Sequence, residues 1–327
     1  MRPLAIAGLA LLATILILAL IRNKPTGRTA ANGPPPPTHA DTLDLAAKPH
    51  LLFQVFGTRD SLRMAPIAAI ANGRLTPIVL DAEGWRGLDA MYLRKDAVYT
   101  LYQDGSATGT ARVLRGMWED ERNPVYRLEG CRSLVPLAAV ELDTRHPQSF
   151  AVELLASTAP LGWRHPAQPL EMPQLLAAVR DIAAAAGRPA AMGRRTLDSL
   201  DSRAVAIPTG ATAGPTLVVS WLDSAASNAR RPAARTRHLF LIADQDSTGA
   251  YTATHVHRVA GALETAEFRR YIDHLDLTGD GVDEIIVEGW RFGGDNWLAI
   301  LAYEDGSWRE VFRSPTDWCL DVREDQN

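Results

Sequence analysis

The segment that most restricts how this chain can be arranged is a run without a charged residue, from Pro3 to Ile21, rich in Leu, Ile and Ala. Its length is close to the roughly 20 apolar residues that a helix needs to cross the hydrocarbon core of a bilayer. A cleaved signal peptide has a shorter apolar region that ends in a small-x-small site. Residues 18–22 read Leu-Ala-Leu-Ile-Arg instead. We therefore predict a retained transmembrane signal anchor over residues 1–22.

Features of the sequence give opposite predictions for the orientation of this anchor. Arg2 precedes the run, and the basic residues Arg22, Lys24 and Arg28 follow it, a bias that taken alone places the body in the cytoplasm. A short N-terminus before a large body is instead the layout of an exported protein, and the Pro-rich linker at residues 23–48 suits a spacer that holds a domain away from a membrane. We predict a bacterial-type, single-pass protein of the inner (cytoplasmic) membrane with an extracytoplasmic, periplasmic body.

The composition of the chain indicates the kind of protein that follows the anchor but does not indicate an activity. Hydrophobic residues make up 46% and charged residues 22% of the chain, which is typical of a globular protein. The formal net charge of −4 argues against a nucleic-acid partner. The two cysteines, Cys131 and Cys319, either form one disulfide, as export permits, or remain two isolated buried thiols.

The first half of the body reads as short strands separated by tight turns. Asn72-Gly73 and Asp104-Gly105 are the strongest hairpin signals. We expect strands at 51–56, 67–70, 75–80, 98–102, 110–114, 126–128 and 134–142. These predict a small antiparallel β barrel or sandwich domain at residues 49–147.

The second half, residues 148–323, predicts an α+β domain dominated by an antiparallel sheet. Apolar residues recur at helical spacing from Leu175 to Ile182, in a run that ends at Gly187, and a short helix is expected around 267–272. Strands are expected at 150–155, 204–207, 217–222, 239–243, 252–258, 285–290, 297–303 and 308–312. The fold class is therefore α+β, mainly antiparallel β, with one or two helices in the second domain.

An acidic loop near the C-terminus is the sharpest candidate site. Calcium prefers six to eight hard oxygen ligands around a tight turn. Asp276, Thr278 and Asp280 alternate along the loop, so that all three side chains can point inward. The Val282 carbonyl and the Glu284 carboxylate can complete the ligands, while Asp283 is expected to point away and to contribute little to stabilisation by calcium. The loop therefore predicts a calcium site, which needs the calcium concentrations that are typical outside cells.

This loop is not an EF-hand, because Val287 stands where an EF-hand needs a bidentate Glu, and the loop leads into a strand. It resembles the loop of FG-GAP and VCBS-type repeats, in which an aspartate-rich turn precedes an apolar strand. The resemblance covers about residues 273–312, in a single copy, and implies that Asp276, Asp280 and Glu284 are side-chain ligands. Thr278 replaces the usual Asp or Asn, which implies weak affinity or a vestigial site. Otherwise the loop is a polar turn that starts a strand.

Two further groups of residues have alternative interpretations. His255 and His257 are two apart on a predicted strand, so both rings face one side, either as the start of a zinc site or as a polar strand edge. Trp290, Trp297 and Trp308 fall close together, either as stacking residues for a glycan or as core.

The resulting functional prediction is a membrane-tethered, non-enzymatic interaction or structural module with a calcium-stabilised sheet. Such repeats usually provide adhesive or scaffolding surfaces, so an envelope protein or a glycan is the expected partner. The chain contains no G-x-S-x-G elbow, Walker loop, G-x-G-x-x-G or H-E-x-x-H pattern that would assign roles in a reaction. The alternative is an envelope hydrolase acting on glycans or peptides.

Overall fold

A computed structural model describes residues 43–58, 61–116, 137–144, 151–162, 172–223, 235–292 and 296–314. The predicted anchor, most of the predicted linker and both cysteines lie outside these residues. Within the described ranges, no helix is both long and apolar enough to cross a membrane. All described residues belong to one compact unit, Pro37–Asn327.

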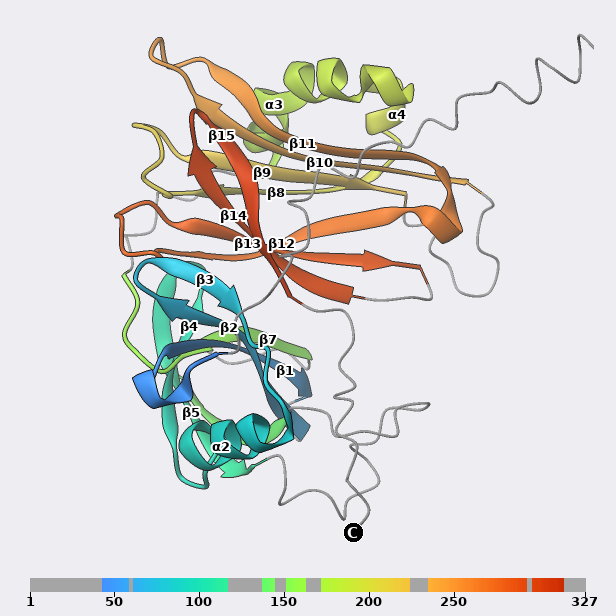
Figure 1. Cartoon of the computed structure of the whole chain (residues 1–327). Helices are drawn as coiled ribbons and strands as arrows, with labels where there is room; N and C mark the ends of the chain where they lie inside the picture. The colour runs from blue at the N-terminus through green and yellow to red at the C-terminus, as the bar shows by residue number, and fades with distance from the viewer. Residues whose placement is uncertain are drawn as a thin grey trace, which may run out of the picture. The chain divides into compact units, whose positions relative to one another are not determined.

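The first half of the described chain is a closed antiparallel barrel (Figure 1). Its six strands are β1 (His50–Thr58), β2 (Ser61–Ala71), β4 (Val98–Gln103), β5 (Ser106–Arg115), β6 (Ala138–Thr144) and β7 (Ala151–Ser157). Their order is β1-β7-β4-β5-β6-β2, and pairing of β1 with β2 closes the ring. The short strand β3 (Arg74–Pro77) extends β2 as a hairpin.

The position of β7 differs from the expected domain boundary near residue 148. This strand pairs with both β1 and β4, so it belongs to the barrel rather than to the second half. Its apolar pattern predicted a strand correctly. That pattern alone carries no information about which sheet the strand joins, because the pairing partners are distant in sequence.

The two predicted hairpin turns are confirmed. Asn72 and Gly73 have φ values of 51° and 69°, and Asp104 and Gly105 have φ values of 51° and 73°. Two successive residues with positive φ define the turn type that matches the twist of paired strands. These turns fix the registers of β2 with β3 and of β4 with β5.

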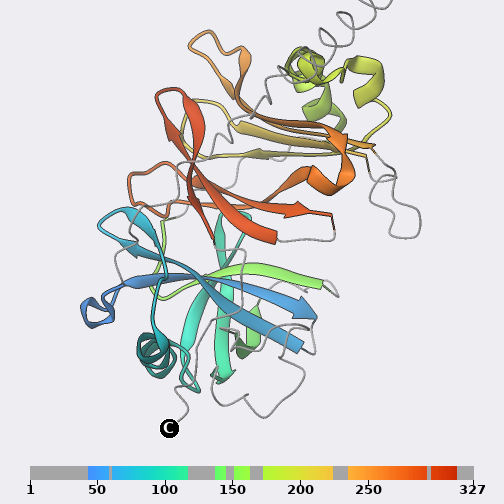
Figure 2. The same cartoon turned by 45° about the vertical axis from the view of Figure 1, so that its right-hand side comes forward.

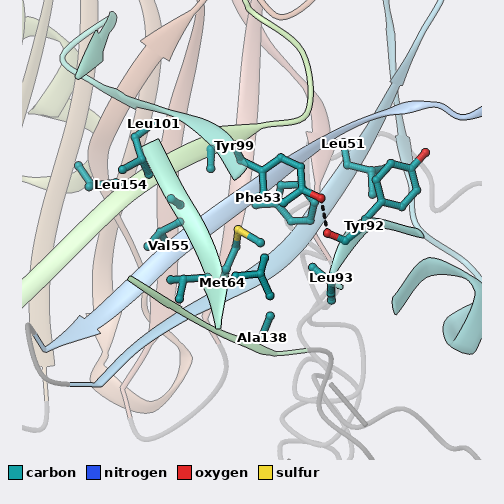
Figure 3. Packing of buried hydrophobic residues seen from close by; sticks show 14 of the residues in the cluster. Leu51, Phe53, Val55, Met64, Tyr92, Leu93, Tyr99, Leu101, Ala138 and Leu154 are labelled. Atoms are coloured by element: carbon teal, nitrogen blue, oxygen red, sulfur yellow. Dashed lines mark hydrogen bonds between the residues drawn. The ribbon is translucent and has the colours of Figure 1, made fainter. Parts of the chain in front are cut away.

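Helix α2 (Ala82–Tyr92) was not predicted from the sequence. It begins after Asp81, whose carboxylate accepts a hydrogen bond from the Gly84 N–H at 2.7 Å. Trp85 and Leu88 belong to the buried barrel core. The same core contains Leu51, Phe53, Val55, Met64, Tyr99, Leu101 and Leu154 (Figure 3). The barrel is therefore filled by packed side chains, and the Tyr99 hydroxyl donates to the Tyr92 carbonyl within that core.

The second half contains two four-stranded antiparallel sheets. The first has the order β11-β10-β9-β8, formed by β8 (Asp201–Ile207), β9 (Thr216–Leu222), β10 (Arg235–Gln245) and β11 (Tyr251–Ala262). Helix α3 (Met172–Gly187) packs on one face of this sheet through Val179 and Ala183. The short helices η4 (Arg188–Ala190) and α4 (Arg194–Leu197) follow α3.

The last sheet has the order β12-β13-β14-β15, formed by β12 (Glu267–Leu275), β13 (Glu284–Arg291), β14 (Asn296–Glu304) and β15 (Ser307–Arg313). The short helix predicted around 267–272 is wrong, because β12 occupies this segment and pairs with β13. Two adjacent arginines hide the strand pattern, since Arg269 is buried in ion pairs instead of exposed.

The β12–β15 sheet lies between the other two sheets and is buried on both faces (Figures 1 and 2). Ile286, Leu298 and Ile300 pack against barrel residues on one face. Ile285, Val287 and Leu301 pack on the other face against the β8–β11 sheet. This arrangement confirms a mainly antiparallel β protein and places the acidic loop, between β12 and β13, beside the barrel.

Candidate functional site

The acidic loop is held in shape by its own carboxylates. Asp276 accepts hydrogen bonds from the Gly279 N–H at 2.7 Å and from the Gly281 N–H at 3.1 Å. Gly279 and Gly281 have φ values of 78° and 87°, a conformation that favours glycine. The Asp280 carboxylate is exposed and accepts the Val282 N–H at 2.8 Å. The loop is therefore an ordered turn.

Glu284 anchors the other end of the loop from the first residue of β13. Its carboxylate accepts the Leu277 N–H at 2.7 Å, the Thr278 N–H at 3.3 Å and the Thr278 hydroxyl at 2.9 Å. Its side chain is buried. Burial, with a smaller contribution from the charge of Asp280, raises the pKa of Glu284 to about 7. A cation at the loop would favour the ionised form.

The oxygen atoms of the loop are of the kinds that bind a hard cation. Carboxylate, hydroxyl and carbonyl oxygens are the ligands that calcium prefers, and an oxygen that accepts one N–H keeps a further lone pair. The carboxylates turn toward N–H groups of the loop. Within the described ranges, no group of three or more His, Cys, Asp or Glu side chains is gathered to hold a metal ion. Asp280, exposed at the tip, is the carboxylate with the most freedom to turn inward.

The loop also contacts elements on both sides of its sheet. A Cβ built on Gly73, in the β2–β3 turn of the barrel, would lie 3.0 Å from the Thr278 carbonyl oxygen. Gly162, which follows β7, forms an isolated β-bridge with Asp276. On the other side, the Asp283 N–H donates to the Thr209 carbonyl at 2.9 Å. The loop thus lies where the barrel and both other sheets meet.

Asp283 lies at the end of the loop, and the sequence did not indicate that it is buried. Its side chain does point away from the loop, but it is fully buried, with Oδ2 3.9 Å from Nε2 of His274. A fully buried carboxylate contributes to packing and to buried electrostatics. A substitution at this position is therefore expected to disturb the fold, whereas its small effect on the calcium-dependent gain in stability stays a prediction.

A buried polar cluster, made of Tyr271, Asp273, His274 and Asp283, lies beneath the Asp104-Gly105 turn of the barrel. Asp273 accepts the Gly105 N–H at 2.8 Å, and the Tyr271 hydroxyl lies 2.7 Å from Nδ1 of His274. Burial raises the pKa of Asp273 to about 7, to which the charges of Asp104 and Asp283 add. Burial lowers the pKa of His274 to about 4.

This polar cluster was not found from the sequence. Its members come from β12 and from the end of the acidic loop, and a turn far away in the chain covers them. The available signal was an acidic residue beside a histidine, between Ile272 and Leu275, which alone does not indicate burial. Arg270, next to the cluster, pairs with Glu153 of the barrel at 2.7 Å and also pairs with Glu288.

The histidine and tryptophan candidates have structural roles in the described chain. His255 and His257 each place a ring nitrogen within hydrogen-bond distance of a backbone carbonyl, of Trp308 at 3.0 Å and of Glu267 at 2.8 Å. Trp297 and Trp308 are each 2% exposed, which makes them core residues rather than a surface for sugar rings, and Trp290 is half-buried and stacks on Phe268. Comparisons with known proteins give no family: no family model, no curated protein and no solved structure matches the chain.

Proposed function

We propose that this chain is a membrane-tethered, extracytoplasmic protein with a non-enzymatic, structural or interaction role, in which the acidic loop binds calcium. The uncharged run Pro3–Ile21 and the Pro-rich linker support the tether. Asp276, Thr278, Asp280 and Glu284 would hold the ion through their side chains, and Val282 would do so through its carbonyl oxygen. The described part of the chain would then be a rigid scaffold outside the cytoplasm.

The observation that carries the proposal is the position of the loop. It touches the barrel at Gly73 and Gly162, and the connection between β8 and β9 at Thr209. Its carboxylate at Glu284 is buried and has a raised pKa. A divalent cation would neutralise this buried acid and the neighbouring Asp280 at the point where three sheets meet. Calcium would therefore stabilise the junction between the sheets.

A non-enzymatic role is supported by the closure of the buried polar cluster of Tyr271, Asp273, His274 and Asp283. A Cβ built on Gly105 would lie 2.4 Å from Nε2 of His274, so the turn sits directly on the ring. Tyr271 and Asp273 are engaged with His274 and Gly105. General acid–base catalysis requires a group within hydrogen-bond reach of a substrate. These side chains are instead covered by the barrel.

Calcium-dependent melting of the full chain in detergent tests the proposal. Binding to the folded state alone stabilises it by RT ln(1 + [L]/Kd), about 1.4 kcal/mol when calcium is tenfold above Kd. We expect the melting temperature to rise across millimolar calcium and the gain to disappear in Asp280→Asn.

The matched control is Asp246→Asn. Asp246 is also exposed and accepts loop hydrogen bonds, from the Thr248 N–H at 2.8 Å and the Ala250 N–H at 3.1 Å. It lies in the β10–β11 turn, away from the acidic loop, so this variant should keep the calcium response. Equal melting temperatures with calcium and with a chelator would leave the loop as a polar turn and remove the basis for the calcium role.

A further inference from the structure

Three histidines line the face of the β8–β11 sheet that packs on the β12–β15 sheet. His238 lies on β10, and His255 and His257 lie on β11, where they pair with Ile242 and Phe240. Phe240 and Ile242 are part of the apolar contact between the two sheets, so the three rings share that face. The rings of His238 and His257 have centroids 5.9 Å apart. We call these three residues the histidine seam.

Hydrogen bonds fix the proton on His238. Nδ1 lies 2.9 Å from the Trp221 carbonyl oxygen, which can only accept, so Nδ1 donates. Nε2 accepts the N–H of Arg269, on β12, at 2.9 Å. His238 is 1% exposed. A second proton on Nε2 would place an N–H of the ring against the N–H of Arg269. Two donors cannot bond to each other, so the contact between β10 and β12 would break.

The other two rings also bond across the boundary between the sheets. His255 donates from Nδ1 to the Trp308 carbonyl of β15, and His257 donates from Nε2 to the Glu267 carbonyl of β12. Nε2 of His255 is buried and has no hydrogen-bond partner in the described residues. A proton added there would bring a buried charge with no group to accept its hydrogen bond.

The charged groups that face the seam are Arg269 and Glu267 on β12 and Glu310 and Arg313 on β15. Arg269 is buried and pairs with Glu267 at 2.8 Å and with Glu310 at 3.0 Å. Arg313 pairs with both acids, at 3.5 Å and 2.6 Å. The two acids are thus already paired with two arginines, and Asp244 of β10, also buried at this contact, accepts hydrogen bonds from Trp308 and Thr254. Among the described residues, protonated histidines therefore meet carboxylates that already have partners.

The electrostatics of the individual rings agree with this geometry. Burial, followed by the charges of His257 and Arg269, lowers the pKa of His238 to about 3. Burial and then Arg269 lower the pKa of His257, and burial lowers the pKa of His255. Although burial alone would raise it, the hydrogen bond and charge of Arg269 lower the pKa of Glu267.

We propose that the histidine seam is an acid-sensitive closure between the β8–β11 and β12–β15 sheets, which holds while the rings are neutral and opens when they are protonated. This device goes beyond the proposed calcium role and does not depend on it. In an extracytoplasmic protein it would make the contact between the two sheets respond to acid outside the cell membrane.

The sign of the effect follows from linkage. A histidine whose pKa is lowered by folding contributes stability that is present above about pH 6.5 and is lost as the pH falls toward its folded value. His238 has a pKa of about 3 while the two sheets are in contact. Lowering the pH from 7.5 to 5 therefore increases the equilibrium constant for separation of the two sheets roughly thirtyfold. His255 and His257 add to this in the same direction.

Hydrogen exchange of the full chain in detergent, read by mass spectrometry and corrected for intrinsic rates, tests the proposal. Between pH 7.5 and pH 5 we expect loss of protection in β11 and β12, with β1 and β5 of the barrel unchanged. His238→Gln keeps an uncharged donor and acceptor, and should reduce the acid response roughly thirtyfold. His50→Gln, at an exposed position on β1, is the matched control and should respond as the natural chain does.

Equal protection of β11 and β12 at both pH values would overturn the proposal. A loss of protection shared equally by β1 and β5 would also overturn it, because it would indicate general acid unfolding. If His238→Gln does not fold, His257→Gln gives the same test, and an unchanged acid response in that variant contradicts the seam. Calcium has no part in this readout, so its outcome is separate from that of the calcium experiment.

Discussion

Substituting Gly105 with alanine tests whether the barrel turn is seated on the buried polar cluster. Gly105 has a φ of 73°, so any side chain is strained there, by about 1–2 kcal/mol for the left-handed conformation. The added Cβ would also lie 2.4 Å from Nε2 and 2.7 Å from Cε1 of His274. Ordinary carbon contacts need about 3.5–4.0 Å, so the ring or the turn must move.

His274 has little room to move. It is 4% exposed, and its Nδ1 is held by the Tyr271 hydroxyl at 2.7 Å. Overpacking of a core position typically costs about 1–3 kcal/mol. Together with the backbone strain, Gly105→Ala should lower the free energy of unfolding by about 2–5 kcal/mol.

The matched control is Gly306→Ala, in the β14–β15 turn. Gly306 has a φ of 77°, nearly the same backbone strain, and a Cβ there would meet no heavy atom within 4 Å. Urea unfolding of both variants measures the difference between their free energies of unfolding, which should be about 1–3 kcal/mol. This difference should become smaller when both substitutions are made in a His274→Ala background. Equal losses in Gly105→Ala and Gly306→Ala would refute the reasoning that the turn rests on His274.

Three further predictions follow from burial, from the anchor and from the cysteines. Asp283→Ala should lower the free energy of unfolding by about 1–3 kcal/mol in urea, because the carboxylate is fully buried; a loss within about 0.5 kcal/mol would mean that the position is not a packed one. The intact chain should remain with membranes after a carbonate wash, owing to Pro3–Ile21, and protease outside the inner membrane should digest the body. A soluble full-length chain, or a body protected until permeabilisation, would contradict that topology. Cys131 and Cys319 should form a disulfide worth roughly 2–4 kcal/mol, visible as faster migration on a non-reducing gel; two reactive thiols in the unfolded chain would contradict it.

Apart from β12, the described strands were predictable, because their local sequence patterns and turns determine them. Asn72-Gly73 and Asp104-Gly105 specify tight turns, and both form as expected. The acidic turn before Ile285 likewise marks the start of β13. What the sequence does not specify is which strands pair over long distances, and so the assignment of β7 to the barrel could not be obtained from its own residues.

The wrong helix at β12 and the missed polar cluster have a common cause, which is polar residues in buried positions. Arg269 reads as exposed in a sequence, yet it is buried between two acids from β12 and β15. Asp283 and His274 read as ordinary polar residues of a loop and a strand, yet each is buried at a junction formed by distant segments. Such burial depends on partners that only the folded chain brings together.

The sequence identified the residues of the acidic loop, and the structure shows which other elements the loop contacts. The alternation of Asp276, Thr278 and Asp280 predicted a calcium site with inward-pointing side chains, and calcium binding stays a prediction. The structure shows that N–H groups of the loop donate to Asp276 and Glu284 and order it. Its contacts with Gly73 and Gly162 could not be predicted, because they depend on how the barrel packs on the sheet.

Calcium binding by the full chain, measured by equilibrium dialysis in detergent, tests the central claim most directly. The account predicts one saturable calcium per chain, with a Kd in the weak range of extracellular modules, about 10⁻⁴–10⁻³ M. Binding should be lost in Asp280→Asn and retained in Asp246→Asn. No saturable binding at millimolar calcium, or equal binding by Asp280→Asn, would contradict the claim.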